Sequence, residues 1–177
     1  MQPTIACLLL SLEDEKIILP TAAIAEIIPY ETPELLDDSP SWFKGILTWR
    51  GIHIPLINMQ TIEPFSAWQE GETKETLENK PETYVAILNR MEKTPGSEAV
   101  GSTHPYPFFS ILIKEIPKLY RLMEEGIKLV NRESSDSRFL MKIAVQSNQA
   151  FIPNLQYFWK IIDGLPSRLQ WFRQAGL

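Results

Sequence analysis

Two histidines, His53 and His104, and the single thiol of Cys7 are the residues of this sequence whose types suit nucleophilic catalysis. A Cys–His pair needs both side chains within hydrogen-bond reach and a thiol whose pKa is lowered. His53 alternates with isoleucines in an expected strand, and His104 lies in a proline-flanked loop. None of the three stands in a recognised nucleophile motif, so we expect no enzyme and no catalytic residue. A small Cys- or His-dependent hydrolase or transferase is the alternative.

Nucleotide and metal sites also lack their usual patterns. The eight glycines form neither GxGxxG nor GxxxxGK[ST], so no loop is expected to hold a phosphate. No HExxH, CxxC or EF-hand spacing is present, which leaves zinc and calcium without a ligand set. The adjacent carboxylates Asp37-Asp38 and Glu124-Glu125 are expected to diverge as solvated charge. We therefore expect no cofactor and no metal.

Composition narrows the class of partner. The 177 residues carry a net charge of -5, with a sequence pI near 5.1, which disfavours nucleic acid. Residues 1–90 hold 6 Lys or Arg and 14 Asp or Glu, whereas residues 91–177 hold 11 and 8. Halves of opposite sign can meet different partners or stack head to tail. A self-assembling structural β protein associated with pili is therefore a second alternative.

The expected location is the cytoplasm. One cysteine excludes an internal disulfide and fits a reducing compartment. The N-terminus lacks the basic start of a signal peptide. The longest uncharged stretches, such as residues 17–25 and 103–113, are shorter than the ~20 residues that cross a bilayer. We expect no direct membrane insertion.

The elements that must position any site are mostly strands. Short apolar runs rich in β-branched and aromatic residues predict about ten of them. They cover residues 7–12, 16–20, 24–29, 46–49, 52–57, 84–88, 108–113, 127–130, 139–145 and 150–152. This spacing favours an antiparallel barrel or sandwich over βαβ units. The strand, turn, strand, proline layout of residues 8–20 recurs at 139–153 and hints at two similar β units.

Helical spacing is confined to the C-terminus. Residues 155–162 predict a helix behind an N-cap at Asn154, and a second short helix is expected from Pro166. Between the halves, residues 70–82 hold five Glu and two Lys. We expect an acidic, solvated linker near residues 63–82.

The most distinctive stretch, residues 39–58, reads SPSWFKGILTWRGIHIPLIN. A helical turn ended by Gly45 is expected before the strand at 46–49. Gly51 suits the positive φ of a tight reversal, which would display Arg50 at the tip with five N–H donors. Pro55 predicts that the returning strand lies at a sheet edge or bulge. Taken alone, such an arginine is most often merely solvated.

This stretch, with Ile24-Ala25-Glu26-Ile27 before it, resembles the CheW-like adaptor family of bacterial chemosensory systems. Members show V-x-E-I, P-x-F/W-x-x-G, N-L-R-G and V/I-x-P-hydrophobic-hydrophobic-D motifs. Here these read as residues 24–27, 40–45, 48–51 and 52–58. The resemblance is clearest across residues 5–62 and extends to about residue 163. It implies a CheW-like domain at 1–163 and a helical tail at 164–177.

The resemblance implies a mainly β fold of two SH3-like five-stranded β-barrel subdomains that share a hydrophobic seam, with short C-terminal helices. The implied function is a non-enzymatic scaffold that couples chemoreceptors to a CheA-type histidine kinase, for chemotaxis or type IV pilus twitching motility. The groove between barrels would hold the cytoplasmic tip of a receptor. Outer barrel edges would meet the regulatory domain of the kinase. We expect a monomer.

The motif positions make Ile24, Glu26, Trp49, Arg50 and Gly51 the expected partner-binding residues. Arg50 is the strongest of these candidates. Ile24 also suits a core position, Glu26 an exposed strand position, and Trp49 a packing position.

Some residues depart from the family pattern. Thr48-Trp49 replaces Asn-Leu, and Asn58 stands where Asp is common. Such divergence resembles accessory members of pilus-linked chemosensory clusters, of the ChpC kind, more than a principal coupling protein.

Overall fold

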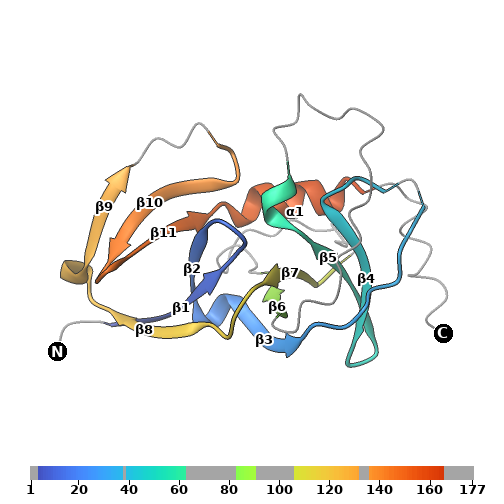
Figure 1. Ribbon diagram of the computed structural model, residues 1–177, viewed down its shortest axis with the longest axis horizontal. Helices are drawn as coiled ribbons and strands as arrows, with labels where there is room; N and C mark the ends of the chain where they lie inside the picture. Colours follow the sequence, from blue (N-terminus) through green and yellow to red (C-terminus); the bar gives the residue numbers. More distant parts are fainter. Residues whose placement is uncertain (1–3, 38, 63–82, 91–105, 132–135, 166–177) are drawn as a thin grey trace, which may run out of the picture.

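A computed structural model describes residues 4–37, 39–62, 83–90, 106–131 and 136–165. These residues form eleven strands in two sheets, followed by one α-helix (Figure 1). The strands are β1 (Ile5–Ser11), β2 (Lys16–Pro20), β3 (Ile24–Pro29), β4 (Phe43–Trp49), β5 (Ile52–Ile57), β6 (Tyr84–Asn89), β7 (Phe108–Ile113), β8 (Lys118–Leu122), β9 (Ile127–Asn131), β10 (Phe139–Val145) and β11 (Asn148–Pro153). The helix is α1 (Leu155–Asp163), and short 3-10 turns are η1 (Thr21–Ala23), η2 (Met59–Thr61) and η4 (Glu124–Gly126).

The prediction of a mainly β fold is confirmed, and the described strands form two sheets rather than two closed five-stranded barrels. One sheet has the strand order β8-β1-β2-β11-β10-β9, and the other has the order β3-β6-β7-β5-β4. The first holds six strands because β8, which the count of apolar runs omitted, pairs with β1. Neither strand order closes on itself in the part of the chain that the structure describes. The outer strands are therefore β8 and β9 in the six-stranded sheet, and β3 and β4 in the five-stranded sheet.

Three apolar clusters explain why so many strands are hydrophobic on both faces. The shared cluster lies between the sheets and includes Leu10, Ile17, Ile57, Leu88, Phe109, Ile111, Phe139 and Phe158. The six-strand cluster consists of Cys7, Leu9, Ile18, Leu122, Ile143, Val145 and Ala150, and the five-strand cluster of Leu47, Ile54, Leu56, Val85 and Ile87. Successive residues of one strand thus enter different clusters, as Leu9 and Leu10 do. The shared cluster corresponds to the predicted hydrophobic seam.

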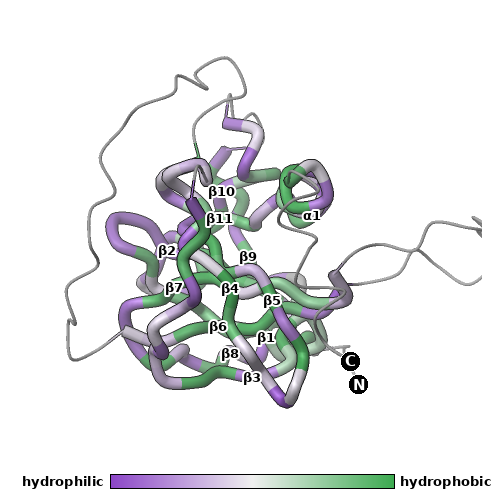
Figure 2. Tube along the Cα trace, turned by 90° about the vertical axis from the view of Figure 1, so that its right-hand side faces the viewer, coloured by the Kyte–Doolittle hydropathy of each residue, from purple (hydrophilic) through white to green (hydrophobic). Residues whose placement is uncertain are grey.

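The C-terminal helix completes the shared cluster. The side chain of Asn154 accepts a hydrogen bond from the backbone N–H of Tyr157, which confirms the predicted N-cap. Phe158 and Ile162 are buried in the shared cluster, one helical turn apart. Figure 2 shows this apolar side of α1 together with the hydrophobic strands. The helix expected from Pro166 and the linker near 63–82 lie outside the described residues.

The recurring strand, turn, strand, proline layout marks two hairpins of one sheet. The first hairpin pairs Leu9 with Ile18, and the second pairs Ile143 with Ala150. The hairpins lie side by side because β2 and β11 pair in parallel at Ile17 and Phe151. The layout therefore records a repeated local structure within the six-stranded sheet.

Two expectations for residues 39–58 were wrong in detail. Gly45 does not end a helical turn: it lies within β4 at a register shift, with φ of 123°. Glycine is required there because a Cβ would overlap the backbone oxygen of Glu34, which bridges to Ile46.

Pro55 is not at a sheet edge or at the bulge, since β5 lies between β4 and β7. It pairs with Ile46, whose backbone N–H and C=O bond to Glu34 and point away from β5. The ladder needs no N–H from Pro55 at such a position. On its other side, Pro55 accepts a hydrogen bond of 3.0 Å from the buried Ser110 hydroxyl.

Candidate functional site

The β4–β5 hairpin displays Arg50 through the geometry of its turn. Trp49 pairs with Ile52, so only Arg50 and Gly51 form the loop. Their φ angles are 51° and 76°, which is the pattern of a type I′ turn and matches the twist of the two strands. Gly51 therefore adopts the predicted positive φ. The Arg50 side chain is 68% exposed, so most of its donors face solvent.

Glu26, on β3, connects this tip to the opposite end of the same sheet. Its Oε2 atom accepts a hydrogen bond of 2.7 Å from Trp49 Nε1 and lies 3.1 Å from Arg50 Nη2. A β-bulge between Ile24 and Glu26 interrupts the pairing with β6 just before this carboxylate. The three side chains form one cluster, which we call the β3–β4 junction: Glu26, Trp49 and Arg50.

The β3–β4 junction brings together the two outer strands of the five-stranded sheet. Because β3 and β4 are the two ends of the strand order, the sheet must curl around the five-strand cluster for these contacts to form. Trp49 packs partly buried against that cluster, and its ring meets the Phe108 ring edge-on at 5.1 Å. The Arg50 guanidinium lies 5.0 Å from the Trp49 ring centre. The junction is therefore both a structural closure and an exposed polar surface.

The structure brings four of the five predicted site residues together. Glu26, Trp49, Arg50 and Gly51 meet at the hairpin tip, whereas Ile24 packs against the shared cluster and pairs with Leu88. The partner-binding role of all five remains a prediction. Phe108, which supports Trp49, was not singled out because it starts an apolar run 59 positions later in the chain. Only the strand order reveals that β7 lies beside β5 of the hairpin.

The predicted nucleophile candidates do not gain reactive surroundings. Cys7 is buried in the six-strand cluster, and burial raises the pKa of its thiol, which disfavours the thiolate. His53 lies in the other sheet, where its Nδ1 is 3.2 Å from the Thr48 hydroxyl. His104 lies outside the described residues. In the ranges that the structure describes, no three His, Cys, Asp or Glu side chains form a group that could hold a metal ion.

No helix among the described residues is both long and apolar enough to span a bilayer.

Comparisons with known proteins define the class. The fold is similar to the crystal structure of the scaffolding protein TtCheW from Thermoanaerobacter tengcongensis, with a TM-score of 0.59 and 14% sequence identity. The alignment covers 86% of this chain and 90% of that one. The model of the CheW-like domain matches residues 6–96, just over half of the chain. No curated protein sequence matches.

The chain therefore belongs to the CheW-like domain family. It is a CheW-like adaptor of chemotaxis signal transduction, and the members of this family are non-enzymatic scaffold proteins.

Proposed function

We propose that this protein is a cytoplasmic, non-enzymatic adaptor that couples the cytoplasmic tip of a chemoreceptor to the regulatory domain of a CheA-type histidine kinase. The observation that carries the proposal is the β3–β4 junction, in a chain that belongs to the CheW-like family. One guanidinium nitrogen of Arg50 pairs with Glu26, and the other N–H donors are available to a partner. Such a group can bind carbonyl or carboxylate oxygens of a partner, and a type I′ turn holds it in place without the partner.

A second surface supports a second partner. Every residue of β9 is exposed, although β9 pairs with β10 along one edge. Ile127, Leu129 and Val130 are 36%, 46% and 47% exposed. An outer strand with exposed apolar side chains, which pairs with a neighbouring strand on one side in the described sheet, suits docking against another β protein. We assign the kinase regulatory domain to β9 and the receptor tip to the surface that includes the β3–β4 junction.

Charge reversal tests the first surface. In an Arg50→Glu variant, the new carboxylate would face Glu26 and a partner's acceptors, so we expect receptor-tip binding to weaken about tenfold or more in calorimetry. Lys160→Glu is the matched control, because it reverses an exposed charge on α1. Wild-type affinity in the Arg50→Glu variant, with an unchanged circular dichroism spectrum, would remove Arg50 from the docking surface.

The double variant Glu26→Arg with Arg50→Glu separates two roles of Arg50. If Arg50 only closes the sheet, the swapped ion pair restores binding. If Arg50 contacts the receptor tip directly, binding stays weak although the melting temperature rises above that of Glu26→Arg alone, which has lost the same bond from Trp49. Our proposal predicts the second result.

The same purified protein tests the β9 assignment. Leu129→Lys should abolish binding of the kinase regulatory domain and leave receptor-tip binding unchanged, because Leu129 belongs to the other sheet. Equal loss of both partners would contradict the division into two surfaces.

We propose further that the chain is an accessory member of a pilus-linked system, on the basis of Trp49 and Asn58 at positions where the family usually has Leu and Asp. Trp49 uses its indole N–H to bind Glu26, which a leucine cannot do. Deletion of the gene should impair twitching and leave swimming intact. Loss of swimming alone would contradict this assignment.

A further inference from the structure

Arg138 reaches from one sheet to the other. It precedes β10 of the six-stranded sheet, and its Nη1 donates hydrogen bonds of 3.1 and 3.2 Å to the backbone oxygens of Met59 and Gln60. Those residues form η2, directly after β5 of the five-stranded sheet. Met59 is itself buried in the shared cluster. The guanidinium thus bonds a backbone segment that is anchored in the core between the sheets.

Asp136 holds this guanidinium in position. Its two carboxylate oxygens accept hydrogen bonds of 3.0 and 2.9 Å from Arg138 Nε, and its Oδ2 accepts one of 2.5 Å from Nη2. The planar fork of arginine makes such a pair directional. The side chains of Arg138 and Asp136 are only 17% and 31% exposed. Water therefore competes weakly for these bonds.

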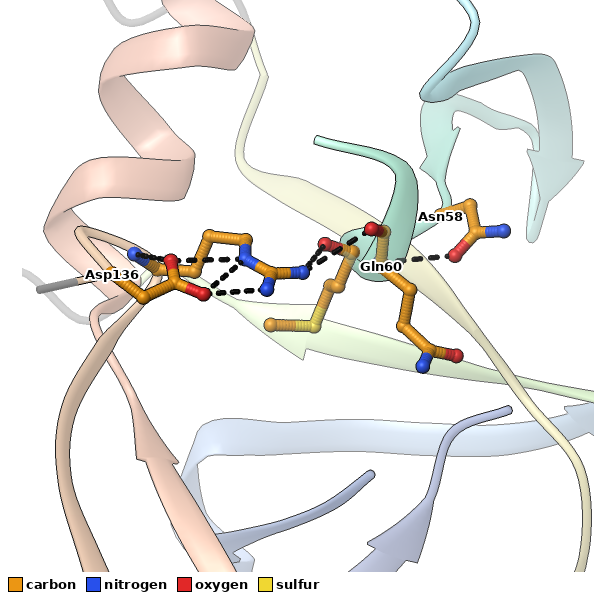
Figure 3. A network of polar contacts seen from close by, with 5 residues as sticks. Asn58, Gln60 and Asp136 are labelled. Carbon is orange, nitrogen blue, oxygen red and sulfur yellow. Dashed lines mark hydrogen bonds and ion pairs between the residues drawn. The ribbon is translucent and has the colours of Figure 1, made fainter. Parts of the chain in front are cut away.

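Two further contacts extend the network, and Figure 3 shows the first of them, between Asn58 and Gln60. The side chain of Asn58 accepts a hydrogen bond of 3.1 Å from the backbone N–H of Gln60 and so closes η2. The side-chain oxygen of Gln60 accepts a hydrogen bond from the backbone N–H of Glu13, in the β1–β2 turn of the six-stranded sheet. The η2 turn is therefore bonded at two points to segments next to strands of the six-stranded sheet, through Arg138 and Glu13.

The charges of the network support the same geometry. Burial alone would raise the pKa of Asp136, but the hydrogen bonds and charge of Arg138 outweigh burial and hold that pKa below its usual value. The hydrogen bond to Asp136 raises the pKa of Arg138 in turn. Both groups are ionised at neutral pH. The ion pair is complete under the conditions in which an adaptor works.

Apolar packing holds the two sheets together, whereas this hydrogen-bond network determines how they are placed. The shared cluster attracts the sheets strongly, but hydrophobic attraction has no direction and tolerates small sliding movements. Hydrogen bonds with fixed partners specify one arrangement. Another ion pair between the sheets, Lys114 with Glu13 at 2.7 Å, is 45% and 52% exposed and is therefore expected to contribute little.

We infer that Arg138 is a positioning residue that fixes the placement of the two sheets and so sets the angle between the β3–β4 junction and β9. This inference rests on the proposed function, because those two surfaces belong to different sheets and would meet different partners. Arg138 itself touches neither surface in the described contacts. Its loss should leave each single binding event intact and impair the arrangement in which both partners are held together.

The test measures the placement directly and without any partner. Nitroxide labels at Ala25→Cys on β3 and Gln149→Cys on β11, both exposed, report the distance between the sheets by pulsed electron resonance. Cys7 is buried with a raised pKa and should remain unlabelled. We expect Arg138→Met to widen the distance distribution about twofold, because the directional contacts are lost while the apolar cluster remains. Lys114→Met, the matched control, should match the wild type.

Arg138→Lys is a milder second variant in case Arg138→Met does not fold. It keeps a positive charge near Asp136 but loses the fork that reaches the η2 carbonyls, so it should widen the distribution in the same direction. An unchanged distribution in a folded Arg138 variant would overturn the inference. A change of equal size in Lys114→Met would also overturn it.

Binding experiments on the same variants distinguish this failure from failure of the proposed function. With both partners present, Arg138→Met should lose assembly of the three-component complex, while each binary affinity stays within about threefold of wild type. If the wild type binds neither partner, the proposed function fails, and the distance measurement still decides the role of Arg138. If Arg138→Met widens the distance distribution but still assembles the three-component complex normally, the placement of the sheets does not affect assembly.

Discussion

At the scale of single residues, the same side chains connect the outer strands of the five-stranded sheet and form its exposed polar surface. Trp49 packs against Phe108 and also donates its indole N–H to Glu26. Glu26 in turn orients Arg50, the most exposed member of the β3–β4 junction. A substitution of Glu26 should therefore alter both the curl of the five-stranded sheet and the surface it presents. Binding data for this residue need a parallel stability measurement.

Gly45 is expected to be the least replaceable of the described glycines. Gly45→Ala should lower the free energy of unfolding by about 2–4 kcal/mol, because the new Cβ would meet the Glu34 backbone and the φ of 123° strains any L side chain. Gly126→Ala is the control, since a Cβ there meets nothing within 4 Å. Urea titrations of both variants measure the difference. Equal midpoints would contradict the proposed clash.

The Asp136–Arg138 ion pair predicts a pH dependence of stability. Because the folded pKa of Asp136 is lowered, its contribution is present above the unfolded pKa and is lost as pH falls through the folded pKa. Near neutral pH, the free energy of unfolding of the wild type should exceed that of Asp136→Asn by about 1–2 kcal/mol. That gap should shrink below about pH 4. A gap that is constant from pH 3 to pH 7 would show that charge is not its source.

At the scale of elements, the sequence predicts most strands but not which strands pair with one another. The run at 108–113, apolar except for Ser110, predicts β7 correctly because residues on both of its faces are buried. β8 was missed because Lys118, Leu119 and Arg121 are exposed on this outer strand, which leaves Tyr120 and Leu122 as a weak alternating signal. The positive φ at Gly51 follows from local turn chemistry, and that prediction was correct.

Contacts distant in the chain could not be predicted in this way. The bond from Trp49 to Glu26 depends on the curl of a whole sheet, and the reach of Arg138 to η2 depends on packing between sheets. Neither is encoded in spacing along the sequence. Pro55 illustrates the same limit, because its place in an inner strand depends on Glu34 bonding to Ile46.

The helix α1 provides an element-scale prediction. Phe158→Ala should destabilise the protein by about 3–5 kcal/mol, because Phe158 is fully buried between the two sheets. Gln156→Ala, at an exposed position on the same helix, should change stability by less than about 0.5 kcal/mol. Thermal or urea unfolding compares the pair. A small loss for Phe158→Ala would mean that α1 is peripheral to the core.

At the scale of the whole molecule, both sheets pair strands that precede the acidic residues 63–82 with strands that follow them. The strands β3, β4 and β5 precede residues 63–82, while their neighbours β6 and β7 follow them. In the other sheet, β1 and β2 pair with β8 and β11. Neither half of the chain therefore contains a complete sheet.

A chain divided within residues 63–82 tests this arrangement. Fragments 1–72 and 73–177 should each lack a cooperative thermal transition, because each leaves unpaired strands and exposed apolar faces. Mixed together, they should form a one-to-one complex with a β-type circular dichroism spectrum. Independent folding of either fragment would contradict the strand order.

The parallel contact between β2 and β11 also bears on how the molecule is made. The hairpin of β1 and β2 is synthesised well before β8 and β11, the strands that cover its outer edges. Until then its apolar faces are open to other nascent chains. Biogenesis of this adaptor should consequently depend on keeping that hairpin apart from other chains until β11 has been synthesised.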